Sequence, residues 1–505
     1  MPIDRRQFIA RGAAVTAGAT LAGIFAEAGP AGAFPPGGYG PLVTDPAGIV
    51  DLPAGFTYKV LAASSTVVTP GAIPDVAATQ LGLRSPAENL GGVPGAPDGM
   101  GSVYDPATKR TYLVCNHELT TSSTPVPTTY RGASVFTHDG GTDADGGCTV
   151  LVLDENMDVI EHFPIIAGTI RNCAGGMTPW GTWITCEENT SSSSGTARLK
   201  HHGYLFEMDP RTGQVAGPYN AMGRANHEAV CIDPATSVAY ITEDATGSVV
   251  YKFVPTDASQ QFGSLGNGGA LFGMKVPGKA NLGDFGTVGE TVTGVTWTPC
   301  PGSPDIAGLA ASFPSADVTR GNKVEGCWWI DGAFWFVSSY SSAGAFPHDG
   351  QVFKYDPVTS SITLVARIPQ GGTTVQLTDG VTTQSHLLLD PDNLAATPYG
   401  GAIWSQDGGS AQYLVCVEAN GSFFPVAKNP AGGEWAGAHF SADGTWLFAN
   451  QQTRGLTLAI TGPWVADPGT PVPEVPTAIL APLTGAAAVA AVLAWRGRRM
   501  STTQA

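Results

Sequence analysis

Between about residues 35 and 464 the chain consists of short apolar runs in which apolar and polar positions alternate, with no long amphipathic helical pattern. The runs are separated by Gly, Pro, Asp and Asn, which are common turn residues. A two-residue period bounded by turn residues is typical of β-strands. The pattern therefore predicts an all-β domain over residues 34–465, built from many short strands.

One unit recurs six times in this region. It begins with an acidic or polar residue beside a small one, continues through an apolar strand and an Asp/Gly turn, and ends with a second apolar strand followed by polar residues. The six units begin at Asp98, Cys173, Glu228, Glu325, Asp392 and Glu434. Their closing residues include Glu118, Glu187, Glu188, Glu243, Asp244, Ser338, Ser339, Gln406, Asp407, Asn450 and Gln451. Irregularly spaced β-units of about 40 or more residues predict a six-bladed β-propeller, and a pair of β-sandwiches is the alternative.

The first two strands of each unit form an antiparallel hairpin, so the start of the first strand and the end of the second lie at the same edge. In a propeller that edge is one mouth of the central channel. The acidic residues of the units should therefore converge there, where crowded carboxylates repel one another unless cations neutralise them. This predicts a multinuclear metal site. The alternative is that the acids satisfy backbone N–H groups separately.

Cys173 occupies one of the six starting positions. A thiolate is a poor ligand for Ca²⁺ but suits iron or zinc, whereas carboxylates suit Ca²⁺. The mixture predicts a transition metal beside Ca²⁺. A buried structural thiol is the alternative for this residue.

Composition and charge exclude some functions. Gly (66) and Pro (39) make up about a fifth of the 505 residues, but 43% hydrophobic residues suffice for a sizeable core and exclude global disorder. The 42 Asp and Glu outnumber the 25 Lys and Arg, which gives a formal net charge of −17. Binding to a phosphate backbone needs clustered Lys and Arg. We therefore expect no nucleic-acid partner.

The N-terminus has the pattern of an export signal. Arg5 and Arg6 precede Phe8 and a weakly apolar stretch, which is typical of a twin-arginine signal over residues 1–33. We therefore expect the twin-arginine translocase to export the protein. The eight cysteines of an exported chain suggest disulfides, although their spacing does not give the connectivity.

The C-terminus predicts attachment to a membrane. A Pro-rich linker, residues 466–477, leads to an uncharged apolar stretch, residues 478–495, and to a basic tail, residues 496–505. The apolar stretch has the length of a short membrane span, and the basic tail places its end inside the cell. It could be a permanent anchor or a sorting helix that is later removed. We expect a monomer at the cell surface, membrane-anchored or secreted.

Several stretches of the chain resemble the PhoX-type alkaline phosphatases. They are Asn172–Glu188, Gly223–Ala229, Tyr240–Asp244, Phe440–Gly444 and Thr457–Trp464. The resemblance covers roughly residues 52–464. It implies a six-bladed propeller with a mixed Fe³⁺ and Ca²⁺ cluster, export by the twin-arginine route, and hydrolysis of small phosphate esters outside the cell.

By this resemblance, Cys173 would be the thiolate ligand of iron. The carboxylate ligands would be Glu187, Glu188, Glu228, Glu243, Asp244 and Glu325, and the repeat geometry adds Asp392, Asp407 and Glu434 to the candidates. Two units depart from the expected pattern, because Gln406 replaces one member of an acidic pair and the fourth unit closes with Ser338 and Ser339.

Hydrolysis of a phosphomonoester requires neutralised phosphoryl oxygens and a nucleophile held in line. An arginine fork binds such oxygens well. Arg224 and Arg171, each a few residues before a candidate ligand, are the candidate arginines. His227 and His117 each precede a carboxylate and are candidates for proton transfer or for orienting a ligand. Packing or surface roles are the alternatives for all four.

Two further hypotheses remain open. One is a calcium-dependent propeller lactonase or esterase, which would need no thiolate ligand. The other is a surface binding propeller that retains Ca²⁺ structurally without catalysis. The sequence contains neither G-x-S-x-G nor H-E-x-x-H, which counts against serine-hydrolase and zincin chemistry.

Overall fold

The structure is a computed structural model that describes residues 34–35, 37–64, 93–195, 197–341, 347–408, 410–418 and 421–464. The predicted export signal, linker, membrane or sorting helix and basic tail lie outside the described residues. Among the described residues, no helix combines the length and apolarity needed to cross a membrane.

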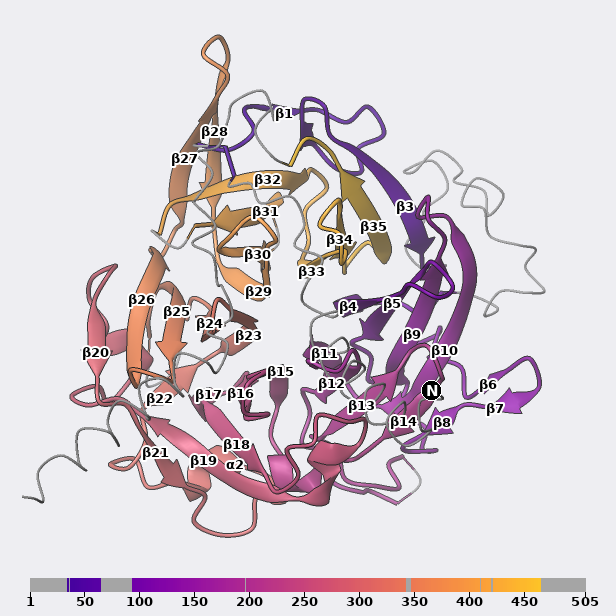
Figure 1. The fold of residues 1–505 in the computed structure, drawn as a ribbon, viewed down its shortest axis with the longest axis vertical. Coiled ribbons are helices and arrows are strands. Elements are labelled where there is room, and N and C mark those ends of the chain that lie inside the picture. The colour runs from indigo at the N-terminus through magenta and orange to yellow at the C-terminus, as the bar shows by residue number, and fades with distance from the viewer. Residues whose placement is uncertain are drawn as a thin grey trace, which may run out of the picture.

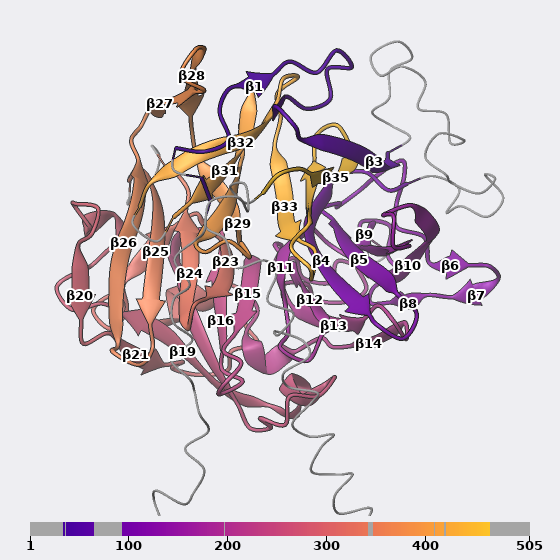
Figure 2. The same ribbon diagram turned by 45° about the horizontal axis from the view of Figure 1, so that its top comes forward.

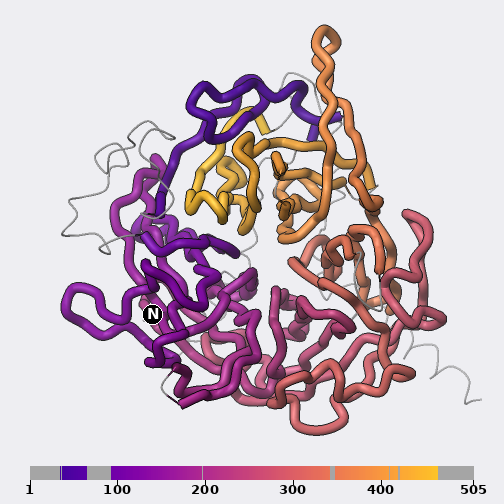
Figure 3. The backbone as a smooth tube through the Cα atoms, turned by 180° about the vertical axis from the view of Figure 1, so that it is seen from behind, coloured from indigo at the N-terminus to yellow at the C-terminus, as the bar shows by residue number. Residues whose placement is uncertain are grey.

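Six sheets, antiparallel except for β8 in the first, stand around a central axis and follow one another in chain order (Figure 1). The same closed ring is visible from the opposite face (Figure 3). The predicted six-bladed β-propeller is therefore confirmed, and the alternative of two β-sandwiches is excluded.

Within each blade the strands follow one another from the central axis outward. Blade 1 contains β4 (Pro97–Asp105), β5 (Arg110–His117), β9 (Gly146–Leu153), β10 (Val159–Thr169) and β8 (Phe136–Thr137), the last being parallel to β10. Blade 2 contains β11 (Asn172–Met177), β12 (Trp183–Glu187), β13 (Leu205–Asp209) and β14 (Gln214–Ala216). Blade 3 contains β15 (His227–Ile232), β16 (Ala239–Glu243), β18 (Tyr251–Pro255), β19 (Gly269–Lys275) and β21 (Thr296–Pro299).

The second half of the ring follows the same plan. Blade 4 contains β23 (Val324–Ile330), β24 (Ala333–Ser338), β25 (Gly350–Asp356), β26 (Ser361–Ile368) and β20 (Thr291–Thr293). Blade 5 contains β29 (Pro391–Ala396), β30 (Ala402–Gln406), β31 (Gln412–Val417) and β32 (Phe423–Asn429). Blade 6 contains β33 (Trp435–Phe440), β34 (Trp446–Gln451), β35 (Leu456–Thr461) and β3 (Thr57–Ala63).

Smaller elements lie in the connections. They are the pairs β1 (Leu42–Val43) with β2 (Leu52–Pro53), β6 (Thr129–Tyr130) with β7 (Ala133–Ser134), β17 (Thr246–Val249) with β22 (Arg320–Asn322) and β27 (Thr373–Thr378) with β28 (Thr383–Leu388), and the short helices η1 (Asn220–Met222), η2 (Ser264–Asn267), η3 (Leu282–Asp284) and α2 (Leu309–Ser312). The hairpin β27–β28 projects from the rim of the ring (Figure 2).

The ring is closed by strands from both ends of the described chain. Strand β3 pairs antiparallel with β35, so the N-terminal segment supplies the outermost strand of the last blade. Four aromatic rings lie nearby and pack edge to face. Tyr39 contacts Phe34, Phe56 and Trp464, and Phe56 also contacts Trp464. Since β3 and β35 are far apart in sequence, their pairing holds the first and last blades together.

Apolar side chains fill the spaces between neighbouring blades all around the ring. The strands present buried residues on both faces, as expected for sheets packed against sheets on both sides. The largest of these side chains include Trp183, Trp335, Trp404 and Trp435, all fully buried. All eight cysteines lie among the described residues and are free thiols, so the suggestion of disulfides is not supported.

Every inner hairpin has a β-bulge near the start of its inner strand. In blade 2, for example, the register passes from Asn172–Glu187 directly to Gly175–Thr185, so that Cys173 and Ala174 oppose the single residue Cys186. A bulge re-aims the side chain of the extra residue. In blades 1 to 5 the bulge therefore determines where the first residue of the repeat points.

Small residues close the channel just below the bulges. A Cβ atom on Gly99 would lie 2.6 Å from Ala174 Cα, and one on Gly326 would lie 2.6 Å from Asn393 Cα. A pocket of only about 20 Å³ lies among these residues of the inner strands. The inner strands of neighbouring blades therefore pack closely just below the mouth.

We expect Gly326→Ala to destabilise the protein by about 1–3 kcal/mol, because the added methyl group would collide with the backbone of blade 5. A Cβ on Gly302 meets no atom within 4 Å, so Gly302→Ala is the control and should change the free energy of unfolding by less than about 0.5 kcal/mol. Denaturant unfolding of both variants checks this, and equal stabilities would contradict the close packing at the axis.

Candidate metal centre

Five of the six blades place a possible metal ligand at the same point of the inner strand. In chain order the residues at this inner position are Asp98, Cys173, Glu228, Glu325, Asp392 and Ala436. In blade 6 the inner position falls to Ala436, because the residue after it, Gly437, packs as the residue after the inner position does in other blades. A Cβ on Gly437 would meet Asp98 O and Met100 N, on either side of Gly99 in blade 1. In the same way Gly99, the residue after Asp98, packs against Ala174, the residue after Cys173 in blade 2.

A second set of residues follows the second strand of each blade at the same mouth. In chain order these exit positions are Glu118, Glu188, Asp244, Ser339, Asp407 and Gln452. A backbone hydrogen bond joins the exit residue to the residue two places before the inner position: Glu188 N donates to Arg171 O (2.8 Å) and Gln452 N to Glu434 O (3.0 Å). Glu434 thus holds in blade 6 the place that Arg171 holds in blade 2, two residues before the inner position.

Five inner residues and two exit residues, Glu118 and Glu188, form a continuous series of possible ligands, which Asp244 and Asp407 do not join. Their ligand atoms lie within 4.8 Å of one another in three overlapping groups, which are Asp98 with Glu118 and Cys173, Cys173 with Glu188 and Glu228, and Glu228 with Glu325 and Asp392. Each group shares one residue with the next. The structure therefore brings together Cys173, Glu188, Glu228, Glu325 and Asp392 among the residues singled out from the sequence.

Glu187 and Glu243 are not brought into this series. Glu187 accepts hydrogen bonds from Ile170 N (2.9 Å), His202 Nδ1 (2.6 Å) and Gly203 N (2.9 Å) inside the blades. Because side chains alternate along a strand, the last strand residue faces away from the mouth when the next residue faces it. The two members of each acidic pair therefore have different environments.

Gln406 is the last residue of its strand in blade 5, as Glu187 is in blade 2, and its side chain also packs inside the blades. Its Oε1 accepts from Tyr413 N (3.1 Å) and its Nε2 donates to Leu389 O (2.9 Å). Since the corresponding Glu187 does not face the mouth, Gln406 removes no carboxylate from it. Asp407, the residue that does face the mouth, is exposed, and its charge contributes to the raised pKa of Asp392.

Burial and mutual repulsion disfavour the ionised carboxylates. Burial, followed by the charge of Glu118, raises the pKa of Asp98 to about 7. Burial and neighbouring carboxylates raise the pKa of Glu325 to about 7 and that of Glu188 to about 9. The pKa values of Glu228, Asp392, Glu434 and the Cys173 thiol are raised well above their usual range, again first by burial. Cations among these groups would favour the ionised forms.

The donor set fits bound metal. Asp98 Oδ1 and Glu228 Oε1 are buried and have no hydrogen-bond partner in the described part of the chain. An unpaired buried carboxylate oxygen is costly unless a cation or donor meets it. Carboxylate oxygens suit Ca²⁺, whereas the thiol of Cys173 suits a transition metal.

Two basic side chains already lie among the carboxylates. Arg171 forms ion pairs with Glu118 (2.5 Å) and Glu188 (2.7 Å). Lys323 pairs with Glu325 (2.7 Å) and with Asp244 at 3.3 Å. Sequence reasoning missed Lys323, although it lies two residues before a ligand candidate, as Arg171 does.

Arg224 lies away from the mouth. It is almost fully buried, and its guanidinium donates to three backbone carbonyls, of His202 (2.8 Å), Thr190 (2.9 Å) and Ser191 (2.9 Å). These carbonyls belong to the loop that leads from Glu188 to β13. The contacts give Arg224 the role of holding this loop in place.

The two candidate histidines are also buried inside the blades. His227 Nε2 is 3.0 Å from Gly223 O, and His117 is hydrogen-bonded to Gly95 O (3.0 Å) and Thr149 Oγ1 (2.9 Å). Burial lowers the pKa of each histidine to about 4, so both rings are neutral at physiological pH. These contacts fit the packing alternative for both residues.

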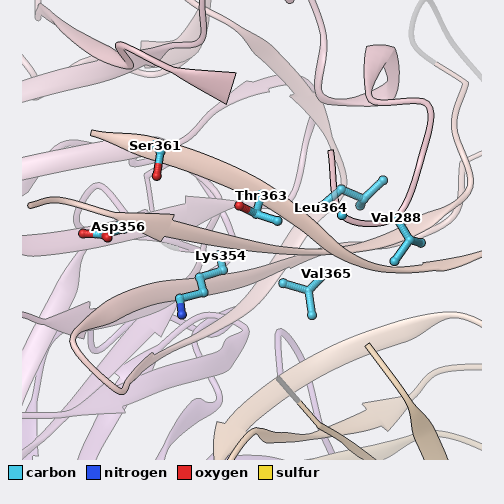
Figure 4. A pocket seen from close by; sticks show the side chains of 8 residues that line it. Val288, Lys354, Asp356, Ser361, Thr363, Leu364 and Val365 are labelled. Carbon is cyan, nitrogen blue, oxygen red and sulfur yellow. The ribbon is translucent and has the colours of Figure 1, made fainter. Parts of the chain in front are cut away.

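A separate pocket of about 300 Å³ lies along β25 and β26 near the rim of blade 4 (Figure 4). Its polar lining consists of Lys354, Asp356, Ser361 and Thr363. It contains no histidine, cysteine or group of carboxylates. The chemistry available there is thus much poorer than at the mouth.

Comparison with known proteins agrees with this geometry. The model of the family described as alkaline phosphatase PhoX matches residues 37–163 and 156–455. The chain belongs to this family. The resemblance inferred from the sequence is therefore confirmed, and the match covers all strands of the propeller except β35.

One solved structure supports the same fold. The structure of Pseudomonas fluorescens PhoX in complex with vanadate, a transition state analogue, is 18% identical, with a TM-score of 0.60, and the match covers 85% of this chain and 98% of that one. A protein of unknown function from Bacteroides thetaiotaomicron (8% identity, 80% and 76% covered) and a gluconolactonase from Xanthomonas campestris (10% identity, 74% and 97% covered) give TM-scores of only 0.42 and 0.34. No curated protein matches the sequence.

We expect Arg224→Gln to destabilise the protein by about 1.5–3 kcal/mol, because three backbone carbonyls, of which that of His202 is buried, lose a charged donor. Proteolysis within residues 190–202 should become faster. Arg211→Gln, at a half-exposed arginine that pairs with Asp209, is the control and should cost about 1 kcal/mol or less. If Arg224→Gln lowered phosphatase activity without changing stability or proteolysis, the loop-holding role would be refuted.

Proposed function

We propose that this protein is an extracytoplasmic, metal-dependent phosphomonoesterase with an iron and calcium cluster at one mouth of its propeller. The observation that carries the proposal is the series of overlapping ligand groups around Cys173, with unpaired buried oxygens on Asp98 and Glu228. Membership of the alkaline phosphatase PhoX family supports the reaction class.

Cys173 is the proposed thiolate ligand of Fe³⁺, and the surrounding carboxylates are the proposed ligands of Fe³⁺ and Ca²⁺. The carboxylates in this set are Asp98, Glu118, Glu188, Glu228, Asp244, Glu325 and Asp392, with Asp407 and Glu434 at its edge. When bound, these cations would supply the positive charge that phosphoryl oxygens require.

The residues of the chain contribute binding and orientation. Arg171 offers a planar fork that matches two phosphoryl oxygens, and Lys323 offers a single charge on the other side of the mouth. Both now pair with candidate ligands. Cations bound to those carboxylates would weaken these ion pairs, which would free the two basic groups for a phosphate ester.

The proposal includes a location outside the cytoplasm. It rests on the twin-arginine pattern of residues 1–33 and the apolar stretch at residues 478–495. Both segments lie outside the described residues. A calcium-dependent lactonase or esterase remains the second candidate, and Cys173 is the residue that argues against it, because such an enzyme needs no thiolate.

We expect Cys173→Ala to lower kcat/KM for a chromogenic phosphomonoester by about 100-fold or more, as loss of a metal ligand removes the charge that stabilises the transition state. Iron content should fall in parallel. Cys416→Ala is a matched control, since Cys416 is also a buried strand thiol but lies in the apolar core of blade 5. Full phosphatase activity in Cys173→Ala would contradict the proposed iron site.

Removal of metal by a chelator should abolish phosphatase activity and lower the melting temperature. Ligand binding at 100-fold above Kd stabilises a protein by about 2.7 kcal/mol, and that amount is lost on removal. Iron and Ca²⁺ together should restore activity, whereas Ca²⁺ alone should not. Restoration of lactonase activity by Ca²⁺ alone, without phosphatase activity, would favour the second candidate.

A further inference from the structure

The bulge that displays Cys173 also disrupts the strand ladder around it. Cys173 and Ala174 have no register partner on β12. Buried backbone carbonyls that lose their ladder partner need another donor. In this blade the donor comes from outside the sheet.

Asn116, near the end of β5 in blade 1, supplies it. Its Nδ2 donates to Cys173 O (2.7 Å) and to Ala174 O (2.5 Å) across the boundary between the two blades. Its Oδ1 accepts from Trp183 Nε1 (2.9 Å) and Cys148 Sγ (3.0 Å). The side chain is fully buried. The two donors onto Oδ1 determine the orientation of the amide, so Nδ2 must face the bulge.

The same position differs among the blades. Counted two residues before the exit position, the residues are Asn116, Cys186, Thr242, Val337, Ser405 and Asn450. Asn450 donates to Asp98 O (2.6 Å) in blade 1. Thr242, by contrast, bonds to Ala229 within its own blade. Amides that cross a blade boundary thus occur at this position where the next inner residue is Asp98 or Cys173.

We propose that Asn116 is a positioning residue for the metal centre: it holds the backbone of Cys173 and thereby determines where the thiolate enters the mouth. This inference rests on the proposed metal centre. Groups that orient a metal ligand typically affect metal affinity by about 10–100-fold without touching the metal. Asn116 does so through the backbone rather than through the ligand side chain.

Asn116→Asp tests this directly, because the carboxylate keeps the shape and the acceptor for Trp183 but faces the two carbonyls without an amide donor. We expect a loss of iron affinity of about 10–100-fold in competition with a chelator. We also expect a shift or loss of the thiolate-to-metal absorption band of the purified protein. Both readouts are independent of turnover.

Three further variants separate positioning from general damage. Asn450→Asp should weaken metal binding but leave the thiolate band in place, because Asn450 holds Asp98. Ser405→Ala is the matched control at the equivalent point of blade 5, where the buried hydroxyl has no hydrogen-bond partner among the described residues, and should change neither readout. Trp183→Phe removes one of the two donors that orient the Asn116 amide, together with part of a fully buried ring, and should move the band in the same direction. It carries the test if Asn116→Asp does not fold.

The outcomes distinguish this inference from the proposed function. Wild-type protein without iron or a thiolate band would refute the metal centre itself. A wild-type band that is unchanged in Asn116→Asp, or in Trp183→Phe, would overturn the role of Asn116 alone. An equal band shift in Asn450→Asp would also overturn it, since the effect would then not pass specifically through Cys173.

Discussion

Buried carboxylates that share one mouth of the propeller are costly to ionise, and positive charge is needed to offset their burial and repulsion. Asp98, Glu188, Glu228 and Glu325 have raised pKa values, first because they are buried and then because neighbouring carboxylates are charged. Arg171 and Lys323 offset part of this charge. Two basic side chains are too few for the whole set, so bound cations are the natural complement of the remaining carboxylates.

The propeller brings this charge together by repeating one local device. In blades 1 to 5 a bulge turns the inner residue toward the mouth, and small residues such as Gly99 and Gly326 let the inner strands approach below it. The bulge has a cost, because it leaves buried carbonyls without ladder partners. Asn116 and Asn450 donate hydrogen bonds to such carbonyls from the neighbouring blades. The bulges that orient the candidate ligands are thus also the points where side chains of neighbouring blades form hydrogen bonds.

Much of this arrangement could be predicted from the sequence, because strands, turns and repeats have local patterns. The six repeats predict six blades, and Cys173 and Glu228 lie where an antiparallel hairpin places them. Side-chain direction was harder: an acidic pair such as Glu187–Glu188 does not show which member faces the mouth until the register is known. In blade 6 the apparent repeat began two residues early, at Glu434, because Ala436 at the inner position carries no polar signal.

Long-range contacts were the other limit. Arg224 lies close to Glu228 in sequence, yet its guanidinium bonds to carbonyls of a loop more than 20 residues away. Lys323 holds in blade 4 the place that Arg171 holds in blade 2, because Lys323 O accepts a hydrogen bond from Ser339 N as Arg171 O does from Glu188 N. Both roles depend on which blades and loops are neighbours in space, which a local pattern does not contain.

The most direct test of the central claim is a crystal structure of the purified protein with anomalous diffraction data that distinguish iron from calcium. The account predicts an iron peak beside Cys173 Sγ and calcium peaks among the carboxylates that run from Asp98 to Asp392. A mouth without anomalous peaks in active protein, with Arg171 and Lys323 still paired with the carboxylates, would contradict it.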